Sequence, residues 1–261
     1  MRFRPCIDIH NGKVKQIVGS SLRDLGDEAV ENFVAEHDAA WHARLFKEAN
    51  LSGGHVILLN HKNSPYFEES KRQALAALAA FPGGLEIGGG ITSDNAADWL
   101  AAGASRVIVQ SYVFHDGKIS FENLRRLERE IGKEQIVLDL SAAKKEENGQ
   151  YYIMTDRWQK FTDTPLDAAL MEALFEFCGE FLVHAISHEG LGGGIDEELV
   201  SLLADNILNP VTYAGGIRSM EDLEELYAIG DGRIDFTIGT GLDIYGGNLS
   251  FRDVVAFAEE H

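Results

Sequence analysis

Two aspartates at the ends of short apolar runs are the strongest candidates for acid–base chemistry. Asp8 ends the run RPCID, and Asp139 ends the run QIVLD. A carboxylate loses hydration at the end of a buried strand, so a functional role would explain its presence there. Two carboxylates that face a common pocket suit general acid–base catalysis, with one protonated and one ionised. The alternative is a pair of buried acids satisfied by backbone N–H groups or by lysines such as Lys13 or Lys15.

Two glycine-rich segments indicate a pair of phosphate sites. EIGGGITS at 86–93 and YAGGIRS at 213–219 share the pattern Gly-Gly-Ile-x-Ser, and a strand-like run that ends in a small polar residue follows each, at 106–111 and 235–240. Glycine lets backbone N–H groups approach an anion, and the start of a following helix adds positive potential. The alternative is that the glycines only make tight turns. The predicted phosphate ligands are Gly88, Gly89, Gly90 and Ser111 at one site, and Gly215, Gly216, Gly239 and Thr240 at the other.

Both features repeat at about half the length of the chain. Gly89 and Gly215 are 126 positions apart, and Asp8 and Asp139 are 131 positions apart. Two independent features with nearly the same offset are typical of a fold built from two similar halves.

Eight short apolar, β-rich runs alternate with amphipathic helical patterns over nearly the whole chain. Continuous apolar runs are typical of parallel strands that are covered on both faces. Eight strand–helix units predict an α/β fold, a single (β/α)8-barrel domain over residues 1–261 with a twofold half-barrel repeat. In such a barrel the two acids lie on opposite sides of the mouth, and the two glycine turns lie at its opposite ends. The expected strands are 4–9, 55–60, 85–87, 106–110, 135–140, 181–186, 211–214 and 234–238.

Two helices are indicated by apolar residues at helical spacing. Leu75, Leu78 and Phe81 mark one of them, and Leu223 and Leu226 mark another. We expect Ser93 and Ser219 to cap helices, because each precedes an acidic first turn.

Two segments interrupt the strand–helix rhythm, at 19–38 and 144–165. Each follows an expected strand, on the face where barrels carry their active-site loops. The second predicts a hairpin with its turn at 147–150, because Asn148-Gly149 favours tight turns. We expect both segments to be mobile covers of the site; insertions without function are the alternative.

The composition excludes several classes of partner. A net charge of −19 disfavours nucleic acid and anionic membranes as partners, so phosphate must be held locally by backbone N–H groups. Two cysteines give no disulfide framework, no apolar run approaches the roughly 18 residues of a membrane span, and the N-terminus runs directly into a strand without a targeting peptide. We expect a cytoplasmic protein, and a monomer because no exposed apolar stripe is evident.

No motif for a metal or an organic cofactor is evident. The nine histidines show no metal-ligand spacing, and HEGLGGGID at 188–196 lacks the spacing of a dinucleotide site. We expect that segment to be a substrate-side loop. His184 is either a hydrogen-bond donor to substrate or a core histidine. The candidate substrate contacts are Lys15, His184, Glu189 and Gly190.

The motifs RPCIDIHNGKVKQIVG, HVILLN, LEIGGGI, HAISHEGLGGGID and YAGGIRSMEDL together resemble the phosphoribosyl isomerases of histidine biosynthesis, in their eukaryotic-type branch. The resemblance covers nearly the whole chain and implies a small bisphosphate substrate, N′-formimino-AICAR ribotide (ProFAR). It implies an Amadori rearrangement of aminoaldose to ketose, without metal or organic cofactor. It also implies that Asp8 removes the C2 proton of the ring-opened imine and that Asp139 is the acid that helps to open the ribose ring.

The sequence departs from the common bacterial pattern of that family at several points. Gln16 replaces an arginine, LLNHKN replaces an Asp-x-Asp pattern, His184-Ala185 replaces Thr-Asp, and Glu189 replaces an aspartate. We interpret these as features of the eukaryotic-type branch; they put a threonine-based role on the sixth strand in doubt.

Two other functions compete with the isomerase. The cyclase subunit of imidazole glycerol phosphate synthase has the same barrel, acids and phosphate sites, but VKQIVGSSL lacks its Val-Lys-Gly-Val-x-Phe segment. A non-catalytic barrel that only binds sugar phosphates gains nothing from two further negative charges.

Overall fold

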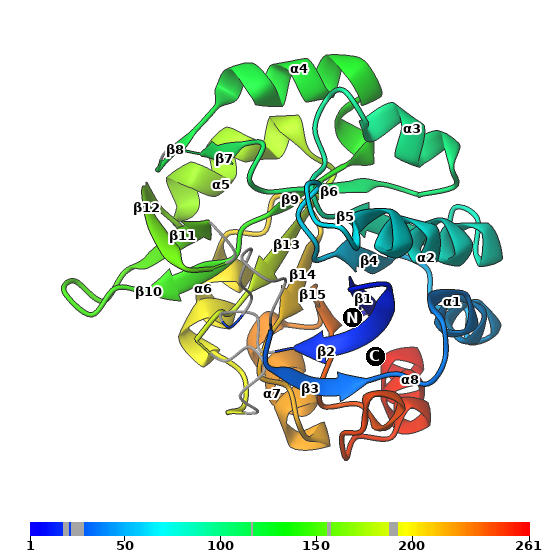
Figure 1. Ribbon diagram of the computed structural model, residues 1–261. Coiled ribbons are helices and arrows are strands. Elements are labelled where there is room, and N and C mark those ends of the chain that lie inside the picture. Colours follow the sequence, from blue (N-terminus) through cyan, green and yellow to red (C-terminus); the bar gives the residue numbers. More distant parts are fainter. Residues whose placement is uncertain (18–20, 22–28, 116, 156–157, 188–192) are drawn as a thin grey trace.

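Eight parallel strands form a closed barrel in the computed structural model, which describes residues 1–17, 21, 29–115, 117–155, 158–187 and 193–261 (Figure 1). The strands are β1 (Cys6–His10), β4 (Gly54–Leu58), β5 (Leu85–Gly88), β6 (Val107–Val109), β9 (Ile136–Asp139), β13 (Glu180–His184), β14 (Val211–Ala214) and β15 (Ile234–Thr237). The segment before β1 closes the barrel, because Phe3 bridges Phe236 in parallel and the amide of Arg4 donates to the Phe236 carbonyl at 2.8 Å. The predicted (β/α)8 barrel is confirmed.

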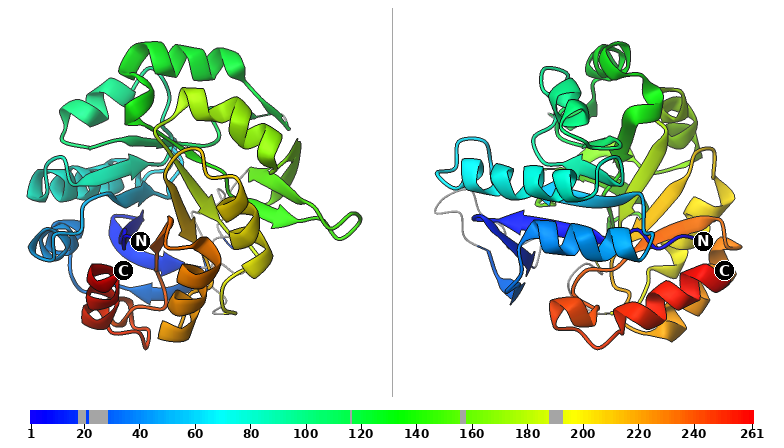
Figure 2. Two further views of the ribbon diagram at one scale, coloured as in Figure 1. Left: turned by 180° about the vertical axis from the view of Figure 1, so that it is seen from behind. Right: turned by 90° about the vertical axis from the view of Figure 1, so that its right-hand side faces the viewer.

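A helix follows each barrel strand and covers the outside of the sheet (Figure 2). The helices are α1 (Ala39–Glu48), α2 (Phe67–Ala80), α3 (Ala96–Ala101), α4 (Phe121–Ile131), α5 (Ala168–Leu174), α6 (Glu197–Asp205), α7 (Met220–Gly230) and α8 (Phe251–Glu260). The chain ends meet, with the Met1 amino group donating to the His261 carbonyl at 3.0 Å. None of the described helices is both long and apolar enough to cross a bilayer.

Alternation along the strands arranges the barrel interior in layers. On β13, Glu180, Leu182 and His184 occupy every second position, so their side chains share the inner face. Glu180 belongs to a charged layer at the amino ends of the strands, Leu182 to an apolar layer, and His184 to a polar layer at the carboxyl ends. The apolar layer contains Ile57, Ile108, Val137, Leu182 and Ala214.

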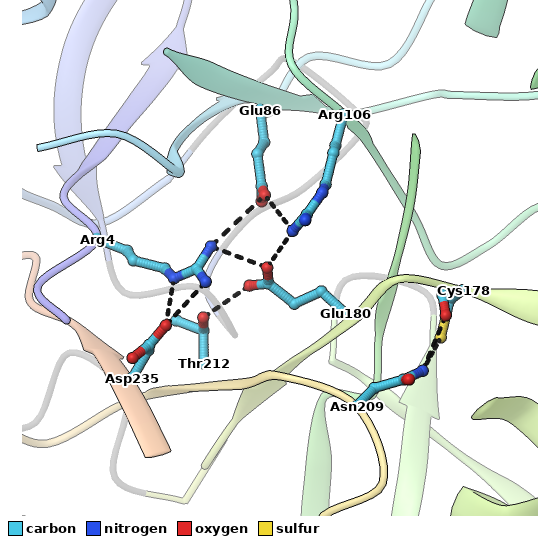
Figure 3. Close-up of polar contacts among 8 residues, drawn as sticks. All are labelled: Arg4, Glu86, Arg106, Cys178, Glu180, Asn209, Thr212 and Asp235. Carbon is cyan, nitrogen blue, oxygen red and sulfur yellow. Dashed lines mark hydrogen bonds and ion pairs between the residues drawn. The ribbon is translucent and has the colours of Figure 1, made fainter. Parts of the chain in front are cut away.

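The charged layer is a buried network of ion pairs (Figure 3). Glu180 lies 2.8 Å from Arg4 and 2.6 Å from Arg106, and Arg4 also lies 2.8 Å from Asp235. Glu86 lies at 3.8 and 3.5 Å from the same two arginines. The network closes the end of the barrel opposite to the active-site face.

Strands outside the barrel are added after β1, β6 and β9. The antiparallel strands β2 (Lys13–Ile17) and β3 (Glu31–Val34) extend the sheet beyond β1, and no feature of the sequence had predicted them. Two-residue strands β7 (Phe114–His115) and β8 (Lys118–Ile119) follow β6.

A separate antiparallel sheet stands out from the barrel at the left of Figure 1. It contains β10 (Ala142–Lys144), β11 (Tyr151–Thr155) and β12 (Lys160–Pro165). Lys144 pairs with Tyr151, so the predicted hairpin around 147–150 is confirmed and a third strand extends it. That this sheet is a mobile cover stays a prediction.

One of the two predicted helix caps is wrong. Ser219 caps α7 in a reciprocal capping box with Asp222, as expected. Helix α3 instead begins at Ala96 with Asn95 at its N-cap, and Ser93 Oγ lies 2.8 Å from the hydroxyl of Tyr112. The predicted apolar spacing also needs one refinement, because Leu78 is buried in α2 but Leu75 is exposed.

Candidate active site

A cavity of about 970 Å³ opens at the carboxyl ends of the barrel strands. Each of the eight parallel strands contributes to its lining, as expected for the face on which such barrels carry their sites. Both predicted acids, His184 and all eight predicted phosphate ligands line this cavity. The topology therefore brings these sequence-predicted residues together.

The two glycine turns have the same backbone conformation. The φ angles are +102° and +69° at Gly89 and Gly90, and +119° and +79° at Gly215 and Gly216. Only glycine adopts such angles without strain. At Gly89 the restriction is also steric, because a Cβ atom there would lie 2.2 Å from the Leu58 carbonyl oxygen. The half-repeat inferred from spacing therefore extends to individual backbone angles.

Each end of the cavity carries backbone amides without acceptors. Within the part of the chain that the structure describes, the N–H groups of Gly90 and Ser111 at one end, and of Gly216 and Thr240 at the other, donate no hydrogen bond. Backbone donors are nearly always satisfied in folded proteins, so grouped orphan donors beside a cavity indicate a ligand that accepts from them.

Asp8 lies beside a neutral side-chain amide. Gln16 on β2 is buried, and its Nε2 lies 3.5 Å from the Asp8 carboxylate. A Cβ atom at position 239 would lie 2.3 Å from Gln16 Oε1, so a side chain there would displace this amide from its present position. The structure thus gives Gly239 a packing role in addition to the phosphate role predicted for it.

Asp139 has a different set of partners. Its Oδ1 accepts from the Ser141 amide at 2.8 Å and from the Ser141 hydroxyl, and it lies 3.6 Å from His184 Nδ1. Burial alone would raise the pKa of Asp139, but the charge of His184 and hydrogen bonds from His184 and Ser141 lower it overall. Asp139 is therefore ionised in the ligand-free protein.

Several cavity residues were not singled out from the sequence. Gln110 directly follows β6, Thr237 ends β15, His55 lies on β4, and Trp158 lies between β11 and β12. Gln110 and Thr237 continue the alternation of inward-facing positions, so strand register could have identified them. Trp158 had no comparable signal, because its place against His184, with ring centroids 5.2 Å apart, depends on the fold of an added sheet.

Three predicted substrate contacts are not placed at the cavity. Lys15 is on β2, makes an ion pair with Glu31, and does not line the cavity. Glu189 and Gly190 lie outside the described residues. Among the residues that are described, no three His, Cys, Asp or Glu side chains group as metal ligands would.

Comparison with known proteins decides the family. The model for "Histidine biosynthesis protein" matches residues 2–247. The chain belongs to this histidine biosynthesis protein family. A Medicago truncatula relative, named as a chloroplastic 1-(5-phosphoribosyl)-5-((5-phosphoribosylamino)methylideneamino)imidazole-4-carboxamide isomerase, is 53% identical over 98% of this chain and 81% of its own length.

Fungal members of the histidine biosynthesis protein family with the same isomerase name are also similar to this chain. The Neurospora crassa protein is 44% identical over 94% of this chain and 93% of its own length. The Saccharomyces cerevisiae protein is 39% identical over 99% and 98% respectively.

Proposed function

We propose that this protein is a ProFAR isomerase, an intramolecular aldose–ketose isomerase of histidine biosynthesis. The observation that carries the proposal is one cavity with orphan amides at both ends and two carboxylates, Asp8 and Asp139, between them. A substrate with a phosphate at each end matches the two sets of amides. The shared name of the plant and fungal relatives supports the same activity.

The phosphates are held by main-chain dipoles rather than by a basic surface. In this proposal Gly88, Gly89, Gly90 and Ser111 hold one phosphate, and Gly215, Gly216, Gly239 and Thr240 hold the other. Local amide donors resolve the conflict between an anionic substrate and a net charge of −19. Arg218, which lines the cavity at the second end, adds a positive charge there.

The two acids divide the chemistry. Asp8 is the base that removes the C2 proton of the ring-opened imine, and it needs no metal to do so. Asp139 serves the acid step that opens the ribose ring. Because Asp139 is ionised before substrate binds, it serves that step together with the groups bonded to it, Ser141 and His184.

An assay with ProFAR alone tests the activity. We expect the purified protein to convert ProFAR to its ketose, followed by ultraviolet absorbance, with no ammonia and no added metal. Turnover only of the downstream ketose in the presence of ammonia would contradict the isomerase and favour the cyclase.

The variant Asp8→Asn separates catalysis from binding. We expect turnover to fall by about 100- to 10,000-fold, the range that a positioned general base contributes. Ligand affinity, measured by calorimetry with ProFAR, stays within about twofold because the phosphate amides are unchanged. Retained turnover in this variant would exclude Asp8 as the base; a wild type that binds ProFAR without converting it would favour a sugar-phosphate sensor.

We propose further that the protein is a cytoplasmic monomer that neither contains a cofactor nor binds nucleic acid. The two cysteines, Cys6 and Cys178, are buried and form no disulfide with each other, which supports a reducing compartment. The plant relative is named chloroplastic, so localisation of a tagged chain is the test of the compartment.

A further inference from the structure

Ser141 connects Asp139 to His184. Ser141 directly precedes β10 and is fully buried, and its hydroxyl donates to Asp139 Oδ1. The same hydroxyl lies 3.2 Å from His184 Nδ1. A hydroxyl has one proton to donate, so once it donates to the carboxylate it can only accept from the imidazole. The chain of bonds therefore runs from His184 Nδ1–H to Ser141 Oγ–H to Asp139.

Backbone pairing holds this arrangement in place. Ala142 and Ala185, the residues that follow Ser141 and His184, form a parallel bridge. The amide of Met154 donates to the Ser141 carbonyl at 2.8 Å, which fixes Ser141 from the β11 side. The Trp158 ring packs on the imidazole. His184 is thus oriented from several elements rather than loosely exposed in the cavity.

We propose that His184 is a catalytic residue that donates the proton of the acid step. In this proposal Asp139 and Ser141 position the imidazole, and the negative charge of Asp139 favours its protonated form. The proposal rests on the isomerase function proposed above. His184 Nδ1 lies 3.2 Å from the Ser141 hydroxyl and 3.6 Å from Asp139, so in this proposal His184 exchanges its proton with substrate through its other ring nitrogen, Nε2. An ionised aspartate next to an imidazole favours its protonated form, as is needed in a proton donor.

The proton balance closes without any other reactant. His184 Nε2 gives its proton to the ring oxygen as the bond between C1 and that oxygen breaks, and the amine lone pair forms C1=N. Asp8 then removes the C2 proton, and the C2–H electron pair forms C1=C2 while the C=N pair returns to nitrogen. Asp8 returns its proton to C1, and neutral His184 takes the proton of the C2 hydroxyl as the ketone forms. Both groups end in their starting state.

Three of the described groups face the His184 imidazole. Asp139 faces it from β9, Ser141 from the turn before β10, and His55 from β4. Burial, with a further contribution from His184, lowers the pKa of His55 to about 3, so His55 is neutral across the working range. Asp139 is then the charged group among these three, and its negative charge favours the protonated form of His184.

The dependence of kcat on pH, measured with ProFAR as substrate, tests the proposal. The proteins compared are the wild type, His184→Gln, Asp139→Asn and the control His115→Gln. His115 is an exposed histidine on β7, outside the cavity. In the wild type we expect activity to fall as the pH rises through the pKa of the donor, because the deprotonated form has no proton to give. In Asp139→Asn this alkaline limb moves to lower pH, because the imidazolium loses its anion.

His184→Gln should lower kcat by at least about 100-fold, which is within the range for loss of a general acid. Its KM should stay within about threefold of the wild-type value. The fall of kcat at alkaline pH should disappear in this variant. In His184→Ala, added imidazole should restore part of kcat, which a merely structural role for His184 would not allow. A His184→Gln variant with kcat within about threefold of wild type and an unchanged alkaline limb would overturn the proposal. Absence of turnover in the wild type would instead contradict the isomerase function itself.

Discussion

At the scale of single residues, the two acids differ through their neighbours. Asp8 lies beside the neutral amide of Gln16, whereas Asp139 is bonded to Ser141 and lies next to His184. Two carboxylates in different environments take different roles. The sequence predicted the pair, because acids that end apolar strands are unusual. It did not predict their partners, because Gln16 and Ser141 reach the acids through pairing geometry that no local pattern shows.

Gln110 offers a test of how the cavity uses buried donors. Its Nε2 is buried and has no hydrogen-bond partner in the described structure, and the residue lines the cavity. Gln110→Met should therefore raise the KM for ProFAR by about 5- to 30-fold, the equivalent of one lost hydrogen bond, while leaving the free energy of unfolding unchanged or slightly higher. Steady-state kinetics and urea unfolding measure the two effects.

Thr237→Val is the matched comparison for Gln110→Met. The Thr237 hydroxyl is also buried without a partner in the described part of the chain. If both substitutions left KM unchanged and destabilised the fold, these groups would be part of the core and not of the ligand site.

At the scale of elements, the glycine turns combine a backbone requirement with a packing requirement. Gly89 and Gly90 both have positive φ, but a side chain at position 89 would meet the Leu58 carbonyl, whereas one at position 90 would meet no atom within 4 Å. Gly89→Ala should lower the free energy of unfolding by more than about 2 kcal/mol and Gly90→Ala by about 1 kcal/mol. Urea unfolding of the ligand-free proteins measures both; equal losses would contradict the steric argument.

Element prediction succeeded where a buried strand or helix has a clear period and failed where tertiary pairing decides. The barrel strands are continuous apolar runs, and all eight were predicted within a few residues. Strands β2 and β3 were missed because they form only by adding to the edge of β1. The Ser93 cap was wrong because α3 starts two residues later than the repeat predicts, and Ser93 pairs with Tyr112 instead.

At the scale of the whole molecule, the charged layer and the cavity lie at opposite ends of the barrel. The charged layer holds two cations, Arg4 and Arg106, against three carboxylates, so one bound proton makes it neutral. Burial, together with the neighbouring Glu180 charge, raises the pKa of Glu86 to about 8. Glu86 also lies farther from both arginines than Glu180 does, so Glu86 is the carboxylate that binds the proton.

Two glutamine substitutions test this assignment. Glu180→Gln breaks the closely paired carboxylate and should lower the free energy of unfolding by about 3 kcal/mol at pH 7, whereas Glu86→Gln resembles the protonated form and should change it by no more than about 1 kcal/mol. The pKa of Glu86 is raised on folding from 4.5 to about 8, so its contribution to stability is fully present below pH 4.5 and is lost as the pH rises through about 8.

Wild type should therefore lose stability relative to Glu86→Gln between pH 5 and 8. Urea unfolding of both proteins across that range measures the difference. A difference that does not change with pH, or Glu86→Gln as damaging as Glu180→Gln, would mean that Glu86 is ionised in the folded protein.

The half-repeat was the feature that made the whole molecule predictable. Spacing of the acids and glycines indicated two similar halves, and the matching φ angles of the two turns agree with that origin. The charged layer was not predicted, because its members come from five separate segments whose inward direction depends on barrel closure.

The most direct test of the account is a crystal structure of the Asp8→Asn variant with ProFAR bound. We expect one phosphate on the amides of Gly90 and Ser111, the other on those of Gly216 and Thr240, and the ribose between positions 8 and 139. A ligand with both phosphates at one end of the cavity, or with its ribose away from these two positions, would contradict it.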